Sequence, residues 1–237
     1  MTTHVQQQLA RLRGRLIVSC QAPPSSPLHD PYVIARFALA AERHGVGAVR
    51  IDSPAHISAT RALCTVPVIG LHKQVHDGSA VYITPTFSAA QDVIEAGADI
   101  VAVDATGRHR PRGERLADII GMVHARGRLV MADVATDAQG LAAAELGVDL
   151  IATTLSGYTE DSVLHPGPDI ALVERLASAT QVPVICEGRV RSTADVRQAF
   201  RAGAYAVVVG GAITGVDALV RHFVEATPSG LAETLDA

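Results

Sequence analysis

Lys73, in the stretch GLHKQV, is the single lysine of a chain whose other Lys/Arg positions are all arginine. Arginine keeps its proton near neutral pH, whereas a partly desolvated lysine can release it. Retention of one lysine therefore predicts a position where a removable proton matters. Glu187, in the stretch VICEG, is the candidate partner in proton transfer, because carboxylates and amines both serve as general acids and bases. A purely structural ion pair of Glu187 with Lys73 or Arg189 is the alternative.

Further polar residues stand at the ends of short apolar runs. They include Gln21, Arg50, Asp52, Asp104, Asp133, Thr153 and Thr154. A lone aspartate in such a position usually caps a helix or anchors a loop. Charged and amide groups that converge from several runs are costly to bury unless a polar ligand or mutual pairing offsets the cost. We therefore predict a site for a polar substrate, with binding residues Gln21, Arg50, Asp104, Asp133 and Thr154.

Two glycine-containing segments indicate an anion site. VVVGGAIT places Gly210 and Gly211 before a predicted helix, where backbone N–H groups can approach a phosphate. EGRVRSTAD adds Arg189 and a capped helix start at Ser192 or Thr193. We predict phosphate binding by these segments, and a tight turn without a ligand is the alternative.

Metal binding and cysteine chemistry are not predicted. His72 and His76 have the spacing of two metal ligands on a helix, but they cross a strand end into a loop and no third ligand accompanies them. Cys186 adjoins Glu187 without a clear base, so a buried packing thiol is expected. With Cys20 and Cys64, which show no Cys-x-x-Cys spacing, it indicates reduced thiols in a cytosolic protein.

The elements that must position these residues follow one repeated phrase. A helical run of Ala, Leu and charged residues ends at a glycine, whose left-handed turn stops the helix, and a short β-branched run follows. The phrase occurs at residues 44–52, 96–104, 146–154 and 202–210. Four more apolar runs alternate with it. The sequence thus predicts eight strands, near residues 15–20, 47–52, 67–72, 99–104, 129–133, 149–154, 183–187 and 205–210.

The predicted strands are continuous apolar runs, which is typical of a parallel sheet covered by helices on both faces. Eight strand–helix units in 237 residues predict a (β/α)8 barrel, whose active site lies at the carboxyl ends of the strands. An open doubly wound sheet is the alternative, although no Gly-x-Gly-x-x-Gly follows the first strand. We predict a single domain over residues 1–237, with a short N-terminal helix, a barrel at about 15–226 and a loose tail at 227–237.

Composition excludes several classes of function. The net charge of −4 and the aromatic content of 3% are unlike a nucleic-acid-binding protein. The basic run RHRPRGER (108–115) is interpreted as a solvated loop or the edge of a site. The polar N-terminus does not resemble a signal peptide, and no apolar run reaches membrane-spanning length. A cytoplasmic protein without nucleic-acid or membrane partners is expected.

With these residues placed, the sequence resembles the family of N-acetylmannosamine-6-phosphate 2-epimerases from about residue 15 to 226. The matching stretches are LIVSCQA, VYITPT, AGADIVAVDAT, MADVAT, TTLSGYT, GPDIALVERL, VPVICEGRV and GAYAVVVGGAIT. The resemblance implies a (β/α)8 barrel that forms a homodimer, needs no organic cofactor or metal, and acts in bacterial sialic-acid breakdown. The implied reaction interconverts N-acetylmannosamine 6-phosphate and N-acetylglucosamine 6-phosphate.

The resemblance also implies roles for individual residues. Lys73 and Glu187 would remove the proton at carbon 2 of the sugar and return one to the other face. Gln21, Arg50 and Asp133 would hold the sugar hydroxyls and the acetamido group. Gly188, Gly210 and Gly211 would cradle the phosphate.

Two positions depart from the family pattern. Gln74-Val75 replaces the usual Arg-Asp after the lysine, and Gly215 stands where an arginine near the phosphate is usual, a role that Arg189 or Arg191 would have to take over. Two other functions stay open: a phosphosugar lyase, decarboxylase or aldolase that forms a Schiff base on the lysine, and a non-catalytic sugar-phosphate sensor.

Overall fold

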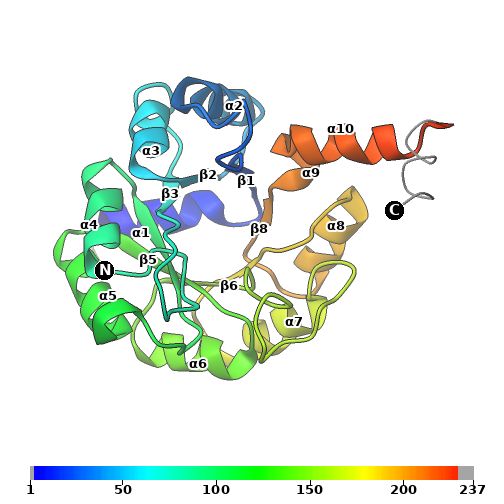
Figure 1. Ribbon diagram of the computed structural model, residues 1–237. Coiled ribbons are helices and arrows are strands. Elements are labelled where there is room, and N and C mark those ends of the chain that lie inside the picture. The colour runs from blue at the N-terminus through cyan, green and yellow to red at the C-terminus, as the bar shows by residue number, and fades with distance from the viewer. Residues whose placement is uncertain (1–2, 229–237) are drawn as a thin grey trace.

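A computed structural model describes residues 3–228 and shows eight parallel strands closed into a barrel (Figure 1). The strands pair in chain order, and β8 pairs with β1 to close the ring. They are β1 (Leu16–Cys20), β2 (Ala48–Asp52), β3 (Val68–Leu71), β4 (Ile100–Asp104), β5 (Leu129–Asp133), β6 (Leu150–Ala152), β7 (Val184–Cys186) and β8 (Ala206–Val209). The predicted (β/α)8 barrel is confirmed, and the open doubly wound sheet is wrong.

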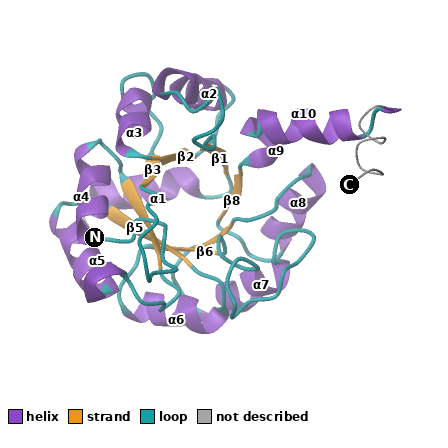
Figure 2. Cartoon of the chain, in the orientation of Figure 1, coloured by secondary structure: helices purple, strands orange, loops and turns teal. Residues whose placement is uncertain are grey.

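Most of the helices surround the strands, whereas the first and the last helix do not belong to that layer (Figure 2). The helices are α1 (Thr3–Leu12), α2 (Pro31–Arg43), α3 (Pro54–Arg61), α4 (Phe87–Glu95), α5 (Leu116–Ala125), α6 (Asp137–Glu145), α7 (Ile170–Ala179), α8 (Thr193–Arg201), α9 (Gly211–Thr214) and α10 (Val216–Glu225), with a 3-10 turn at Pro111–Gly113. The four glycines of the repeated phrase have positive φ, as the sequence predicts: Gly45, Gly97, Gly147 and Gly203. Each helix therefore stops where the chain must return to the barrel.

The interior of the barrel is apolar away from the carboxyl ends of the strands. Buried side chains from the strands fill it, among them Ile17, Ile69, Ile100 and Met131. Leu12 of α1 belongs to the same cluster, and Figure 1 shows α1 lying across one end of the barrel. The predicted N-terminal helix thus closes the end opposite the carboxyl ends of the strands.

Every second residue of a barrel strand faces the interior. Ala48, Met131 and Ile185 are part of the inner apolar cluster. The residues two positions later are Arg50, Asp133 and Glu187. The polar residues therefore continue the inward register of the apolar ones, one layer closer to the open end.

The last helix, α10, follows α9 and projects away from the barrel (Figure 1). None of its residues is buried, and Val220, Phe223 and Val224 are more than half exposed. The predicted tail at 227–237 lies, apart from its first two residues, outside the described residues. Across residues 3–228, no helix combines the length and the apolar character that crossing a membrane requires.

Candidate active site

A cavity of about 770 Å³ opens at the carboxyl ends of the strands. Nine of the eleven residues predicted for the site line it: Gln21, Arg50, Lys73, Thr154, Glu187, Gly188, Arg189, Gly210 and Gly211. Asp133 lies beneath the cavity wall and is fully buried. Asp104 is also buried and does not line the cavity. The strand-end positions are therefore gathered around one space, as the barrel register requires.

Arg50 holds two carboxylates at the base of this cavity. One guanidinium nitrogen lies 2.7 Å from Asp133 Oδ2, and the other lies 3.1 Å from Glu187 Oε1. Thr154 donates its hydroxyl to the second oxygen of Asp133 at 2.6 Å. Arg50 Nε and Glu187 Oε2 are buried without a hydrogen-bond partner among the described residues. Buried polar atoms are usually paired, so these two are exceptions that lie next to the cavity.

The position of Glu187 is fixed by hydrogen bonds to its backbone. Thr153 Oγ1 donates to the carbonyl oxygen of Glu187 at 2.9 Å and accepts its N–H at 3.1 Å. Burial raises the pKa of the Glu187 carboxyl to about 7, although the Arg50 charge opposes that rise. A carboxyl with a pKa near 7 can take up and release a proton at neutral pH.

Lys73 approaches the cavity from the loop that follows β3. Its ammonium group donates to Gln21 Oε1 at 2.5 Å and lies 3.7 Å from Asp52 Oδ2. Partial removal from water lowers the pKa of Lys73, and the Asp52 carboxylate opposes this. β3 and β7 stand opposite one another in an eight-stranded ring. Lys73 and Glu187 can therefore address opposite faces of a ligand between them.

Several lining residues were not predicted from the sequence. They are Ser19, Tyr82, Tyr158 and His222, among others. Most of them lie on loops or on α10, where no strand periodicity marks an inward position. Arg189, which was predicted, donates to the carbonyls of Ser156 and Gly167 at 2.8 and 3.0 Å. Two of the guanidinium nitrogens of Arg189 thus hold the loop after β6 in place.

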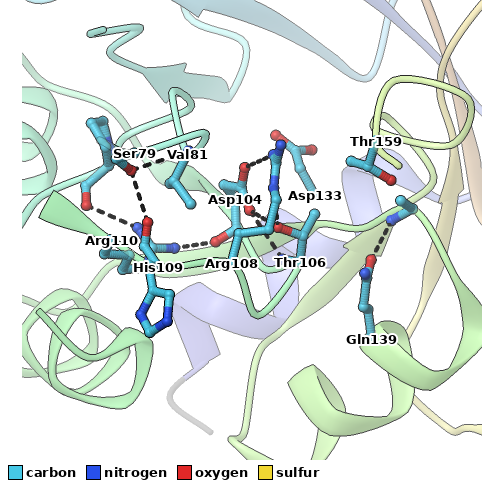
Figure 3. A network of polar contacts seen from close by, with 12 residues as sticks. Ser79, Val81, Asp104, Thr106, Arg108, His109, Arg110, Asp133, Gln139 and Thr159 are labelled. Carbon is cyan, nitrogen blue, oxygen red and sulfur yellow. Dashed lines mark hydrogen bonds and ion pairs between the residues drawn. The ribbon is translucent and has the colours of Figure 1, made fainter. Parts of the chain in front are cut away.

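Asp104 does not face the cavity, and its carboxylate contacts residues that follow it closely in the chain (Figure 3). Its carboxylate accepts from the N–H and the hydroxyl of Thr106 at 3.0 and 2.7 Å, and pairs with Arg108 at 2.7 Å. Arg110 donates to the carbonyls of Thr84, Pro85 and Asp104 and is 8% exposed. The basic run predicted as a solvated loop or site edge thus contains one buried arginine that ties two loops together.

The structure offers no metal centre within residues 3–228. His72 and His76 each contact Gln74 at 3.3 Å and do not face a common point with a third ligand. All three cysteines are buried and unpaired with one another. Burial raises the pKa of the Cys186 thiol to about 12, so it stays protonated at neutral pH.

Comparison with known proteins matches this barrel to one family. Residues 34–229 match the family described as "Putative N-acetylmannosamine-6-phosphate epimerase". The chain belongs to this family. A protein of Synechococcus elongatus named "Putative N-acetylmannosamine-6-phosphate 2-epimerase" is 49% identical over 224 residues, covering 93% of this chain and 97% of that protein.

Solved structures agree with the family assignment. The N-acetylmannosamine-6-phosphate 2-epimerase from Clostridium perfringens superposes with a TM-score of 0.90 at 39% identity, covering 92% of this chain and 96% of the other. A thiamine phosphate pyrophosphorylase from Pyrococcus furiosus, at 15% identity and a TM-score of 0.59, shares only the fold. The expected family resemblance is confirmed.

The turn between α9 and α10 leaves no room for a side chain at Gly215. A Cβ atom added to Gly215 would lie 2.6 Å from the carbonyl oxygen of Gly211 and 2.8 Å from its Cα atom. Real Cβ atoms do not approach backbone that closely, so the present turn between α9 and α10 excludes any side chain at this position. A positive charge for a phosphate must come from another residue.

Proposed function

We propose that the chain interconverts N-acetylmannosamine 6-phosphate and N-acetylglucosamine 6-phosphate. The observation that carries the proposal is that Lys73, after β3, and Glu187, after β7, enter one cavity from opposite strands of the ring, each with a pKa shifted toward neutrality. The printed names of its relatives support the same substrate.

The chemistry follows from the two groups. Inversion at carbon 2 requires removal of the proton next to the masked aldehyde and return of a proton to the other face. Lys73 and Glu187 can each hold that proton, and general acid–base groups of this kind contribute about 10² to 10⁴ in rate. Arg50, with its unpaired buried Nε, and Gln21 would hold the sugar between them. No cofactor or metal is needed for this proton transfer.

We infer that the phosphate binds between the loops after β7 and β8. Gly188 and Gly211 leave open space there, because an added Cβ atom would meet no atom closer than 3.6 Å. Arg191 lines the cavity with an exposed side chain, and it uses its backbone N–H to bond Asp195 at 2.9 Å. Among residues 3–228 its guanidinium has no hydrogen bond or ion pair and can contact an anion, whereas that of Arg189 donates to loop carbonyls.

Arg191→Gln tests this phosphate subsite. We expect KM for the sugar phosphate to rise about tenfold with little change in kcat, because uniform binding energy is lost. Arg201→Gln, at the far end of α8, is the matched control and should change neither constant. An unchanged KM in Arg191→Gln would exclude Arg191 as the phosphate ligand.

We also propose a homodimer, in which a second copy covers the apolar face of α10. Val220, Phe223 and Val224 are 56, 71 and 53% exposed, more than a soluble monomer usually leaves together. The expected mass in sedimentation is twice the 24.7 kDa of one chain. By its family, we place the protein in the cytoplasm and in sialic-acid and amino-sugar catabolism.

The reaction is tested by proton NMR of N-acetylmannosamine 6-phosphate with the protein in heavy water. Conversion to the gluco epimer with deuterium at carbon 2 is expected, and Lys73→Ala and Lys73→Arg should both abolish it. Lys73→Arg is the sharper variant, because it keeps the charge and removes only the releasable proton. A folded wild type that neither converts the sugar nor exchanges deuterium would overturn the proposal. Borohydride trapping of a substrate adduct on Lys73 would instead favour the lyase or aldolase alternative.

A further inference from the structure

Asp52, the last residue of β2, contacts Lys73 at two points. Its Oδ1 atom accepts the backbone N–H of Lys73 at 3.0 Å, and its Oδ2 atom lies 3.7 Å from the Lys73 ammonium nitrogen. The Asp52 side chain is 22% exposed. One carboxylate therefore contacts both the main chain and the functional group of the same lysine.

The backbone around Asp52 is held in place for this double contact. The next residue, Ser53, has φ 76° and ψ 145°, a conformation that residues other than glycine rarely adopt. Its N–H donates to the carbonyl of Leu71 at 2.8 Å, and Leu71 is the register partner of Asp52 in the β2–β3 ladder. Such a conformation persists only where the surroundings enforce it, so the end of β2 is locked against the end of β3.

We propose that Asp52 is the positioning residue of Lys73, which fixes its backbone at the cavity wall and holds its ammonium group next to the neutral acceptor Gln21. The catalytic consequence rests on the function proposed above. The contact itself does not, because it is a property of the free protein.

The charges that face Lys73 come from several strands. Asp52 and Arg50 of β2, Asp133 of β5 and Glu187 after β7 act on it, and loss of hydration opposes its charge most strongly. Of these carboxylates Asp52 has the largest effect on the pKa of Lys73.

Asp52 is also not neutralised by its own neighbour on α3. The Nδ1 atom of His56 contacts the backbone carbonyl of Asp52 at 3.0 Å, and burial lowers the pKa of this histidine. His56 is therefore neutral at pH 7 and places no positive charge beside Asp52. Removal of the Asp52 charge must then lower the pKa of Lys73 further.

Because Lys73 is the only lysine, its titration can be observed directly. Protein labelled with lysine carrying ¹³C at Cε gives one lysine signal, whose shift is followed from pH 5 to 11 without substrate. We expect Asp52→Asn, which keeps an oxygen for the Lys73 N–H, to move the titration midpoint down by about one pH unit or more. Asp52→Glu should titrate near the wild-type midpoint, because it keeps the charge.

Asp92→Asn is the matched control. Asp92 lies on α4, 3.9 Å from the ring of His72, beside the same loop but away from the ammonium group. It should leave the midpoint unchanged. Equal midpoints in wild type and Asp52→Asn would overturn the proposal, as would an equal shift in Asp92→Asn.

Activity provides the second readout. If Lys73 acts as a base, the acidic limb of the pH profile of kcat/KM, which reports the free enzyme, should move down in Asp52→Asn by the same interval as the NMR midpoint. Asp52→Ala should lower kcat at least tenfold at every pH, because it also releases the Lys73 backbone. Loss of activity without any movement of the limb or the midpoint would mean a merely structural role. Absence of wild-type turnover would instead refute the proposed reaction, and the NMR titration would still decide on Asp52.

Discussion

Two arginine–aspartate networks lie side by side at the mouth of the barrel, and they serve different purposes. Asp104 and Asp133 are register partners on neighbouring strands, and each is paired with an arginine at 2.7 Å. Around Asp133, the pairing with Arg50 leaves buried atoms unsatisfied, Arg50 Nε and Glu187 Oε2. Around Asp104, no such atom remains among the described residues. Incomplete pairing, more than charge itself, distinguishes the network of Asp133 from that of Asp104.

The partners also differ in distance along the chain. Arg108 lies four residues after Asp104, whereas Arg50 lies 83 residues before Asp133. A local pair stiffens one loop. A long-range pair joins β2 to β5, and through Glu187 to β7, so it fixes the relative positions of groups that must meet one substrate. The second arrangement suits preorganisation of a site, which requires rigid elements.

The largest expected effect comes from breaking the unsatisfied network. Glu187→Gln keeps the size and a hydrogen-bonding oxygen but removes the ionisable group. We expect kcat to fall about 10³-fold, within the range for a lost general acid or base, while the protein stays folded. Steady-state kinetics with circular dichroism measures both quantities. A fall of less than fivefold would mean that Lys73 performs both proton transfers.

A change in the network around Asp104 should instead lower stability and leave kcat nearly unchanged. Arg110→Met removes three donations to loop carbonyls from a buried side chain. We expect the free energy of unfolding in urea to drop by about 2 kcal/mol, the scale for lost charge-assisted hydrogen bonds. At temperatures where the variant is folded, kcat should stay within threefold of the wild type. Arg112→Met, on the same loop and 71% exposed, is the control and should be neutral. A large loss of kcat in Arg110→Met at unchanged stability would contradict a purely structural role of the network around Asp104.

The contrast between the networks also shows what the sequence can reveal. The eight strands were predictable because four of them follow a helix that ends at a glycine and the others are short apolar runs that alternate with these, both of which are local signals. The site was predictable in part because strand register is local too: Arg50 and Glu187 face inward by the period of two. Local patterns do not indicate which residue of opposite charge a buried charged side chain will pair with.

Asp104 and Asp133 illustrate this limit. They stand in the similar stretches VAVDAT and MADVAT, and both were predicted to bind substrate. The Asp-x-x-x-Arg spacing of Asp104 and Arg108 was the one available sign of a local pair. Tyr82 and Tyr158 were missed because they lie on loops after strands, where neither period nor composition indicates direction.

The last expected effect is confined to a window of pH, because Glu187 makes the stability of the fold depend on pH. Its pKa is raised from 4.5 in the unfolded chain to about 7 in the folded protein. Between these values the folded state holds a proton that the unfolded state lacks, so stability is greatest below the lower value and declines as pH rises through 7. Between pH 5 and 8, the free energy of unfolding of the wild type should decrease by about 2 kcal/mol relative to that of Glu187→Gln. Parallel curves would show that Arg50 keeps Glu187 ionised throughout, and that its unpaired oxygen is a fixed hydrogen-bond acceptor for the substrate.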